Sequence, residues 1–219
     1  MRGESVRGSR TFVKVCGLRC PSALGACGNA DAVGIVVDPR SRRCVAPETA
    51  RDLVRSAPCP AYLVSTSTDA THWCQLAEAT GARCAQVHAP DGTEAVSMLQ
   101  DSYGMRVMQA FFVPEASADP RADAQALCRA IDRSHADMAL LDTGAGTGRA
   151  HDRAVSRLVA RDVDIVLAGG LSPETVQEAL RDIGPAGVDV SSGVESGGRQ
   201  DPEKIQAFLT AVRSMEVVT

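Results

Sequence analysis

Short apolar runs alternate with amphipathic stretches along nearly the whole chain. The runs are rich in Val, Leu, Ala and Ile, and such segments suit strands that are buried on both faces of a sheet. This pattern predicts eight strands, over Phe12–Cys16, Ala32–Val37, Ala61–Val64, Ala85–His88, Val107–Phe112, Met138–Leu141, Ile165–Leu167 and Val188–Val190.

The stretches between the runs have the spacing of helices with one apolar face. Asp69–Thr80 shows this spacing, and Pro47–Ser56 carries the early proline and glutamate that are typical of a helix N-terminus. Ser172–Leu180 begins with Ser-Pro-Glu, so Ser172 is expected to cap a helix with proline at its first position. Pro202–Val212 repeats this design.

The alternation of strands and helices predicts βα units and a parallel sheet of the α/β class. Periodicity alone fits an open doubly wound sheet as well as a closed barrel. Polar residues and glycines follow many of the runs directly, and barrel enzymes gather their chemistry at the carboxyl ends of many strands, whereas open sheets use one switch point. We therefore predict a single eight-stranded parallel (β/α)8 TIM barrel over residues 11–219, after a disordered leader over residues 1–10.

The charge of the chain narrows the range of partners. Its 219 residues include 23 basic and 27 acidic side chains, a net charge of −4. This balance argues against nucleic acid or an anionic membrane as the main partner. A local phosphate site is still compatible with it, because a helix N-terminus and one arginine can hold such an anion. No apolar run reaches the ~18 residues that span a bilayer.

The eight cysteines indicate a reducing compartment. They contain no Cys-x-x-Cys pair, which gives no support to a zinc ribbon or a thioredoxin-type motif. The N-terminal sequence MRGESVRGSR is basic and polar and lacks the apolar core of a secretory signal. We therefore expect reduced thiols in a cytoplasmic protein, most of them serving as small hydrophobic side chains.

Several segments in a fixed order carry a more specific signal, and the Val-Asp-Val-Ser-Ser-Gly-Val-Glu run is the most specific of them. The strong matches are Lys14–Leu18, Asp31–Glu48, Ala168–Glu174 and Gly187–Ser196, and the weaker ones are Gln86–His88 and Leu140–Thr143 with the glycines of the sixth loop. Together they resemble the phosphoribosylanthranilate isomerases of tryptophan biosynthesis, over nearly the whole chain from residue 12 onward.

The resemblance implies a (β/α)8 barrel that converts N-(5′-phosphoribosyl)anthranilate to 1-(2-carboxyphenylamino)-1-deoxyribulose 5-phosphate. This Amadori rearrangement is an aldose–ketose isomerisation that needs neither a metal nor an organic cofactor. The sugar ring must open, which requires an acid at the ring oxygen. A proton must then leave C2′ of the resulting iminium, which requires a base, so two titratable groups must face the sugar.

By this match Asp142 is the general acid and Cys16 the general base. A thiol serves as a base only if its thiolate is stabilised, and Lys14 and Arg43 could supply that stabilisation. Lys14 lies two residues before Cys16 and therefore can lie on the same side of the strand. Arg43 matches the family position that binds the anthranilate carboxylate, and its planar fork suits that anion.

The phosphate requires backbone N–H donors and a helix dipole, which barrel enzymes commonly supply in the loops after strands seven and eight. Glycines there let the backbone approach phosphate oxygens closely. Lys14 is also expected to contact the substrate from the first strand, and Gln86 and His88 are expected to contact it from the fourth strand. The predicted phosphate-binding residues are Gly169, Gly170, Asp189, Ser191, Ser192 and Gly193.

Each candidate also has a purely structural interpretation. Cys16 could be a buried core thiol, Asp142 a helix N-cap, and His88 a hydrogen-bonding partner for a neighbour. Arg43 follows Arg40 and Arg42, so it could belong to a solvated basic loop. The motif around each residue favours the functional interpretation.

The chain departs from the family around the aglycone and the lid. Cys44 stands where an aromatic residue is usual, Ala89 where glycine follows the histidine, and the polar Ser65–Thr68 where the family has an apolar-Val-Asn pattern. Ala145 and His151 differ in the sixth loop. These changes fit a different aromatic amine, a larger pocket, or drift with the activity intact.

The sequence leaves three alternatives open. A paralogue could perform the same isomerisation on another phosphoribosyl N-glycoside in a specialised pathway. A non-catalytic barrel could bind a phosphosugar, but it would be expected to lose Cys16 or Asp142, and both are present. The third alternative is the related histidine-pathway isomerase, but its first strand usually ends in Asp, where this chain has Cys16. The oligomeric state is not predicted.

Overall fold

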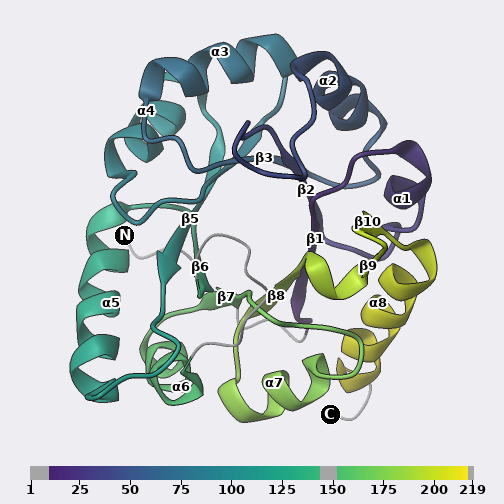
Figure 1. Cartoon of the computed structure of the whole chain (residues 1–219). Helices are drawn as coiled ribbons and strands as arrows, with labels where there is room; N and C mark the ends of the chain where they lie inside the picture. Colours follow the sequence, from purple (N-terminus) through teal and green to yellow (C-terminus); the bar gives the residue numbers. More distant parts are fainter. Residues whose placement is uncertain (1–9, 144–151, 217–219) are drawn as a thin grey trace.

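The strands close into a barrel, as the computed structural model of residues 10–143 and 152–216 shows (Figure 1). Each strand pairs in parallel with the next, and β8 pairs with β1. The closed barrel is therefore confirmed, and the open-sheet alternative is wrong. The strands are β1 Phe12–Cys16, β2 Ala32–Val36, β3 Ala61–Ser65, β4 Cys84–Val87, β5 Arg106–Phe112, β6 Met138–Asp142, β7 Ile165–Leu167 and β8 Gly187–Val190.

A ring of helices surrounds the barrel (Figure 1). After β8 the chain forms a 3₁₀ turn and a two-stranded antiparallel ribbon before the last helix, and neither feature was predicted. The helices are α1 Pro21–Gly25, α2 Pro47–Ser56, α3 Ala70–Thr80, α4 Thr93–Tyr103, α5 Pro120–Ser134, α6 Arg153–Asp162, α7 Val176–Ile183 and α8 Pro202–Glu216; the turn is η1 Ser192–Val194 and the ribbon is β9 Glu195–Ser196 with β10 Arg199–Gln200.

The expected start of one helix is wrong. The segment predicted from Ser172 becomes α7 only at Val176. The Ser172 hydroxyl donates to the Glu174 carboxylate at 2.6 Å, and its backbone N–H donates to the Thr175 hydroxyl at 2.9 Å. Because its side chain is engaged in this way, Ser172 leads into a turn rather than capping the helix.

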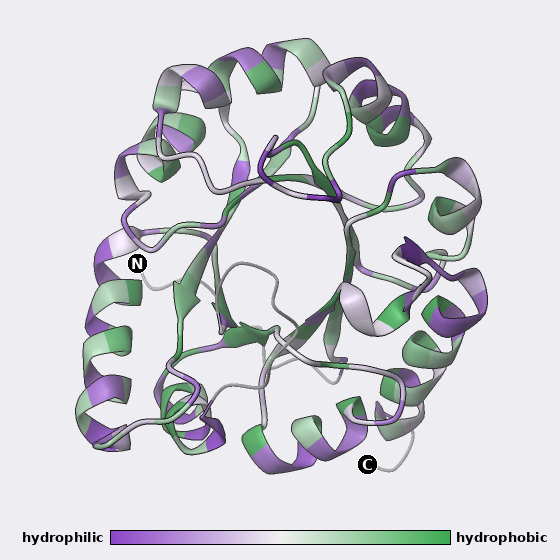
Figure 2. Ribbon diagram, viewed as in Figure 1, coloured by the Kyte–Doolittle hydropathy of each residue, from purple (hydrophilic) through white to green (hydrophobic). Residues whose placement is uncertain are grey.

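Alternation along the strands separates two apolar regions. Val13 and Val15 face outward and join the core between strands and helices, where the inward faces of the helices are hydrophobic (Figure 2). Residues of the other parity point into the barrel, and Tyr62, Met108 and Leu140 fill part of its interior. This alternation leaves Lys14 and Cys16 of β1 inside the barrel.

Several sequence expectations fall outside the described residues. They concern the leader, except for Arg10, and the lid positions Ala145 and His151. Arg10 itself pairs with Asp31 at 3.2 Å. Within the described ranges, no helix is both long and apolar enough to cross a membrane.

Candidate active site

A cavity of about 770 Å³ opens at the carboxyl ends of the strands. Its volume lies in the usual range of small-molecule sites, roughly 300 to 1,000 Å³. Apart from Lys14 and Gly193, every predicted site residue lines it. These lining residues are Cys16, Arg43, Gln86, His88, Asp142, Gly169, Gly170, Asp189, Ser191 and Ser192.

Cys16 and Lys14 share one side of β1 above a glycine. A Cβ atom added to Gly34 would lie 2.6 Å from the Cys16 Sγ and 3.0 Å from the Lys14 Nζ, so only glycine leaves room for both groups. Lys14 is fully buried, and its Nζ donates to Asp189 Oδ2 at 3.0 Å. Strand register explains this pair, because Lys14 and Asp189 lie side by side on β1 and β8.

The thiol of Cys16 is under opposing influences. Burial is the largest and raises its pKa above the ordinary 9.0, whereas the charges of Lys14 and Arg43 act to lower it. The two cations therefore act in the predicted direction, but burial outweighs them. Burial also acts to lower the pKa of Lys14, yet Asp189 and Cys16 raise it, so Lys14 stays charged beside the thiol.

We expect iodoacetamide to modify Cys20 faster than Cys16 at pH 7 to 8. Hydrogen bonds with Ser22 and Ala23 lower the pKa of the exposed Cys20, whereas burial raises that of Cys16. The thiolate is the reactive form, and its fraction rises about tenfold per pH unit below the pKa, so Cys16 labelling should still be rising at pH 9. Peptide mass spectrometry over a pH series measures both rates. Faster labelling of Cys16 than of Cys20 at neutral pH would contradict the raised pKa of the Cys16 thiol.

Asp142 lies at the end of β6 within a short hydrogen-bonded chain. Its Oδ1 accepts from the Thr143 N–H at 2.7 Å, and its Oδ2 lies 3.3 Å from His88 Nε2. The Gln86 amide nitrogen lies 3.0 Å from His88 Nδ1, and Phe112 packs against the same ring at a centroid distance of 5.7 Å. An amide that donates to Nδ1 leaves the imidazole proton on Nε2, facing Asp142. Asp142 is thus the last residue of β6.

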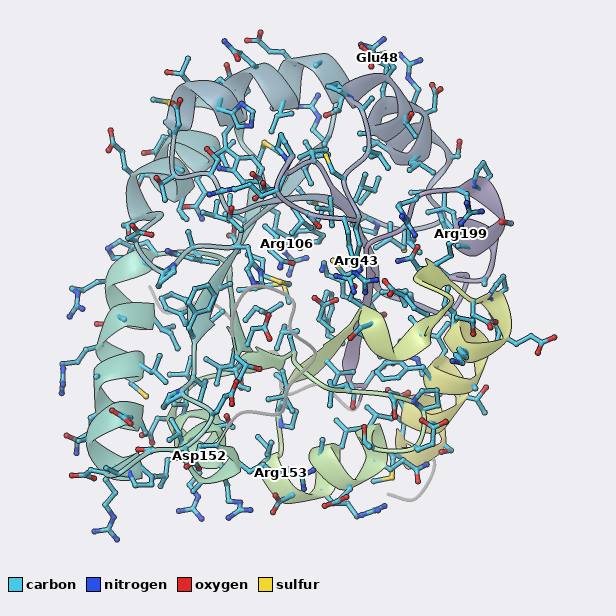
Figure 3. The ribbon with its side chains drawn as sticks, viewed as in Figure 1. Arg43, Glu48, Arg106, Asp152, Arg153 and Arg199 are labelled. Carbon is cyan, nitrogen blue, oxygen red and sulfur yellow. The ribbon has the colours of Figure 1, made fainter. Side chains whose placement is uncertain are left out.

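Arg43 differs from the arginines beside it. Its side chain is 9% exposed, against 60% for Arg42 and 73% for Arg40. The Arg43 Nε donates to Glu195 Oε1 at 2.6 Å, and Figure 3 shows the side chain near the mouth of the barrel. The solvated-loop interpretation is therefore wrong for Arg43, although it describes Arg40 and Arg42.

The segments after β7 and β8 form another wall of the cavity. Gly169 and Gly170 have φ of 84° and 66°, in the left-handed region that favours glycine. Ser191 and Ser192 lead into the turn η1. A Cβ on Gly193 would lie 1.8 Å from the Leu171 carbonyl oxygen, so this glycine packs the two segments together rather than lining the cavity.

One of the predicted phosphate-binding residues, Asp189, requires a correction. Its carboxylate lies inside the barrel on Lys14, and an anionic side chain repels phosphate. Its second oxygen, Oδ1, is buried without a hydrogen-bond partner among the described residues. The side chain therefore serves Lys14 and the cavity rather than the phosphate.

The sequence analysis missed a polar cluster at the rim. Asp38 accepts from the Thr66 N–H at 2.9 Å and the Arg40 N–H at 3.0 Å, and these three residues line the cavity. Burial acts to raise the pKa of Asp38, but hydrogen bonds from Thr66 and Arg40 hold it well below its usual range. The polar Ser65–Thr68 segment was noticed in the sequence, but its partner on the neighbouring strand could not be known without the sheet register.

Comparisons with known proteins identify the family of the chain. A family model described as N-(5′-phosphoribosyl)anthranilate (PRA) isomerase matches residues 13–211. A Thermococcus kodakarensis protein named N-(5′-phosphoribosyl)anthranilate isomerase is 48% identical, over 93% of this chain and 98% of its own. The solved structure of N-(5′-phosphoribosyl)anthranilate isomerase from Pyrococcus furiosus has a TM-score of 0.87 and 39% identity, covering 94% of this chain and 100% of its own.

A further solved phosphoribosyl anthranilate isomerase holds a ligand. It is in complex with reduced 1-(o-carboxyphenylamino)-1-deoxyribulose 5-phosphate. Its TM-score is 0.73 at 26% identity, and the match covers 93% of this chain and 99% of that one.

Proposed function

This chain belongs to the N-(5′-phosphoribosyl)anthranilate isomerase family, and from that premise we propose how its own residues carry out the reaction. It is an isomerase that converts N-(5′-phosphoribosyl)anthranilate to 1-(2-carboxyphenylamino)-1-deoxyribulose 5-phosphate. Asp142 acts as the general acid and Cys16 as the general base.

One observation carries these two roles. Cys16 ends β1 and Asp142 ends β6, and both side chains line the same cavity with β7 and β8 between their strands. Lys14 lies beside the thiol, and His88 lies beside the carboxyl group. A sugar held between them would meet an acid and a base on different walls.

The proposed chemistry begins with one proton transfer from Asp142 and one to Cys16. Asp142 gives a proton to the furanose ring oxygen, the C1′–O bond breaks, and the nitrogen lone pair forms the C1′=N iminium. Cys16 removes the proton from C2′, and the electrons of that C–H bond neutralise the iminium to give an enolamine. In the last step C1′ of the enolamine gains a proton and the C2′ hydroxyl loses one, which gives the ketone product without any net change in protons.

The raised pKa of Cys16 fits this order of events. Burial raises the pKa of Cys16 and so favours the neutral thiol. The ring-opened substrate brings a cationic iminium beside the sulfur, and a nearby positive charge favours the thiolate. Lys14, which stays charged because of Asp189, acts in the same direction.

The anionic groups of the substrate have separate partners in the proposal. Backbone N–H groups around Gly169, Gly170, Ser191 and Ser192 are the candidates for the phosphate, since these residues line the cavity after β7 and β8. Arg43 is the candidate for the anthranilate carboxylate. Gln86 acts through His88, which it holds in one tautomer.

The comparisons favour the anthranilate substrate over another N-glycoside. The departures at the rim coexist with 48% identity to a protein named for the anthranilate reaction. Of the altered positions, Ala89 lines the cavity directly, and Thr66 of the polar segment is tied to Asp38.

The proposed compartment is the cytoplasm. All eight cysteines are free, which supports a reducing environment.

The test is a fluorescence assay with phosphoribosylanthranilate generated in situ. Loss of substrate is followed as purified protein is added. We expect kcat/KM of at least ~10⁴ M⁻¹s⁻¹, the lower part of the ordinary enzyme range. A folded protein that binds the reduced product analogue without turning over this substrate would overturn the anthranilate assignment.

A further inference from the structure

Glu195 has no role in the mechanism above, yet its carboxylate is buried beside the cavity and both of its oxygens are engaged. Its Oε1 accepts from the Arg43 Nε at 2.6 Å and from the Gln200 amide at 3.4 Å. Its Oε2 accepts from Arg42 Nη2 at 2.7 Å. The side chains of Glu195 and Arg43 are only 6% and 9% exposed, so water screens the ion pair between them little.

The far side of the Arg43 guanidinium is different. Its Nη2, at the outer end of the guanidinium, is buried and has no hydrogen-bond partner among the described residues, while the Nε is held by Glu195. A charged donor that is buried without an acceptor is unfavourable. Since Arg43 lines the cavity, this orphaned donor indicates an anionic group of the ligand.

The stem of Arg43 is also held in one position. It crosses Gly17, whose φ is 86°, and a Cβ added there would lie 2.6 Å from the Arg43 Cδ. The ribbon that carries Glu195 is anchored in turn, because Lys204 Nζ donates to the Glu195 carbonyl oxygen at 2.8 Å. Arg43 is thus fixed both along its stem and at its Nε.

We propose that Glu195 is a positioning residue, which holds Arg43 so that Nη2 faces the ortho carboxylate of the aryl group. This inference rests on the proposed function and adds the source of its selectivity for an N-aryl glycoside that carries a carboxylate. Glu195 occupies the Nε edge and leaves the outer edge of the planar fork for the substrate.

An alternative role for Glu195, in which its carboxylate only neutralises Arg43, predicts the opposite change in KM. If the carboxylate only neutralised Arg43, its removal would strengthen the attraction between the guanidinium and an anionic substrate. If it positions Arg43, its removal lets the arginine turn away and weakens binding. The direction of the change in KM therefore separates the two roles.

The experiment measures Glu195→Gln against two substrates, N-(5′-phosphoribosyl)anthranilate and N-(5′-phosphoribosyl)aniline, which lacks the carboxylate. We expect KM for the anthranilate glycoside to rise about tenfold or more, the size of effect of a lost charged hydrogen bond. Its kcat and both constants for the aniline glycoside should be little changed. Glu203→Gln is the matched control, since it makes the same change at an exposed carboxylate on α8, and it should behave like the unaltered protein.

An equal rise of KM for both substrates would overturn the proposal, and so would a fall in KM for the anthranilate glycoside. Arg43→Met gives a second test, because Glu195→Gln should add nothing further once Arg43 is absent. Calorimetric binding of the product and of its phenylamino counterpart keeps the proposal testable without turnover. A protein that turns over neither glycoside but loses affinity for the carboxylated product alone in Glu195→Gln would retain this inference while the proposed function failed.

Discussion

Replacing Cys16 with alanine is expected to lower kcat by about 10²- to 10⁴-fold, the usual contribution of a general base. The thiol lies in the cavity beside the charged Lys14, and the proposed mechanism gives no other group the proton of C2′. Alanine fits the same space above Gly34, so the barrel should remain folded. The fluorescence assay gives kcat, and circular dichroism during heating gives the unfolding temperature.

Cys20→Ala is the matched control for this variant. Cys20 is exposed and bonds only locally with Ser22, so its loss should leave turnover unchanged. Near-normal turnover of Cys16→Ala would exclude the thiol as the base. A Cys16→Ala protein that fails to fold would instead make Cys16→Ser, which keeps the size of the side chain, the decisive variant.

Asp142→Asn is expected to cost a similar factor of about 10² to 10⁴ in kcat, because an amide cannot give up a proton to the ring oxygen. The change is nearly isosteric. The amide oxygen can still accept from the Thr143 N–H, as Oδ1 does at 2.7 Å, so the end of β6 should keep its shape. Steady-state assays of the pure variant provide kcat and KM separately.

Asp132→Asn serves as the comparison for Asp142→Asn. Asp132 is exposed on α5, away from the cavity. Its substitution by asparagine therefore removes the same charge from the protein without altering the site. Turnover of Asp142→Asn within a few fold of that control would rule out Asp142 as the acid. A rise in KM alone, with kcat kept, would assign it to binding instead.

The strands were predictable because burial on both faces leaves a strong signal in sequence. Each predicted strand lies within one residue of an observed one at either end. The start of α7 was not predictable from local sequence. Ser-Pro-Glu is typical of a helix N-terminus, but here the Ser172 hydroxyl donates to Glu174 and its N–H donates to Thr175, which forms a turn before the helix. The prediction that the sheet closes into a barrel depended on the polar residues that follow many strands, and this is a weaker signal than periodicity.

The candidate site was predicted as a set of residues but not as a set of contacts. The i−2 spacing placed Lys14 beside Cys16, yet the pairing of Lys14 with Asp189 depends on the register of β1 against β8. Glu195 stood within a segment that was noted, but its contact with Arg43 joins residues 152 positions apart. Sequence patterns report local spacing, and such long-range pairs follow only from the closed fold.

The same long-range pairs determine when the site can form while the chain is being synthesised. Lys14 meets Asp189 across 175 positions, and Arg43 meets Glu195 across 152. On the ribosome the base, its lysine and the carboxylate-binding arginine emerge early, whereas their acidic partners emerge near the end. A nascent chain stalled before β8 therefore exposes a lysine and an arginine that have no counter-ion, and it cannot bind substrate. Pairing of β8 and β9 with the early part of the chain, rather than formation of the first strands, is therefore the step that completes the site.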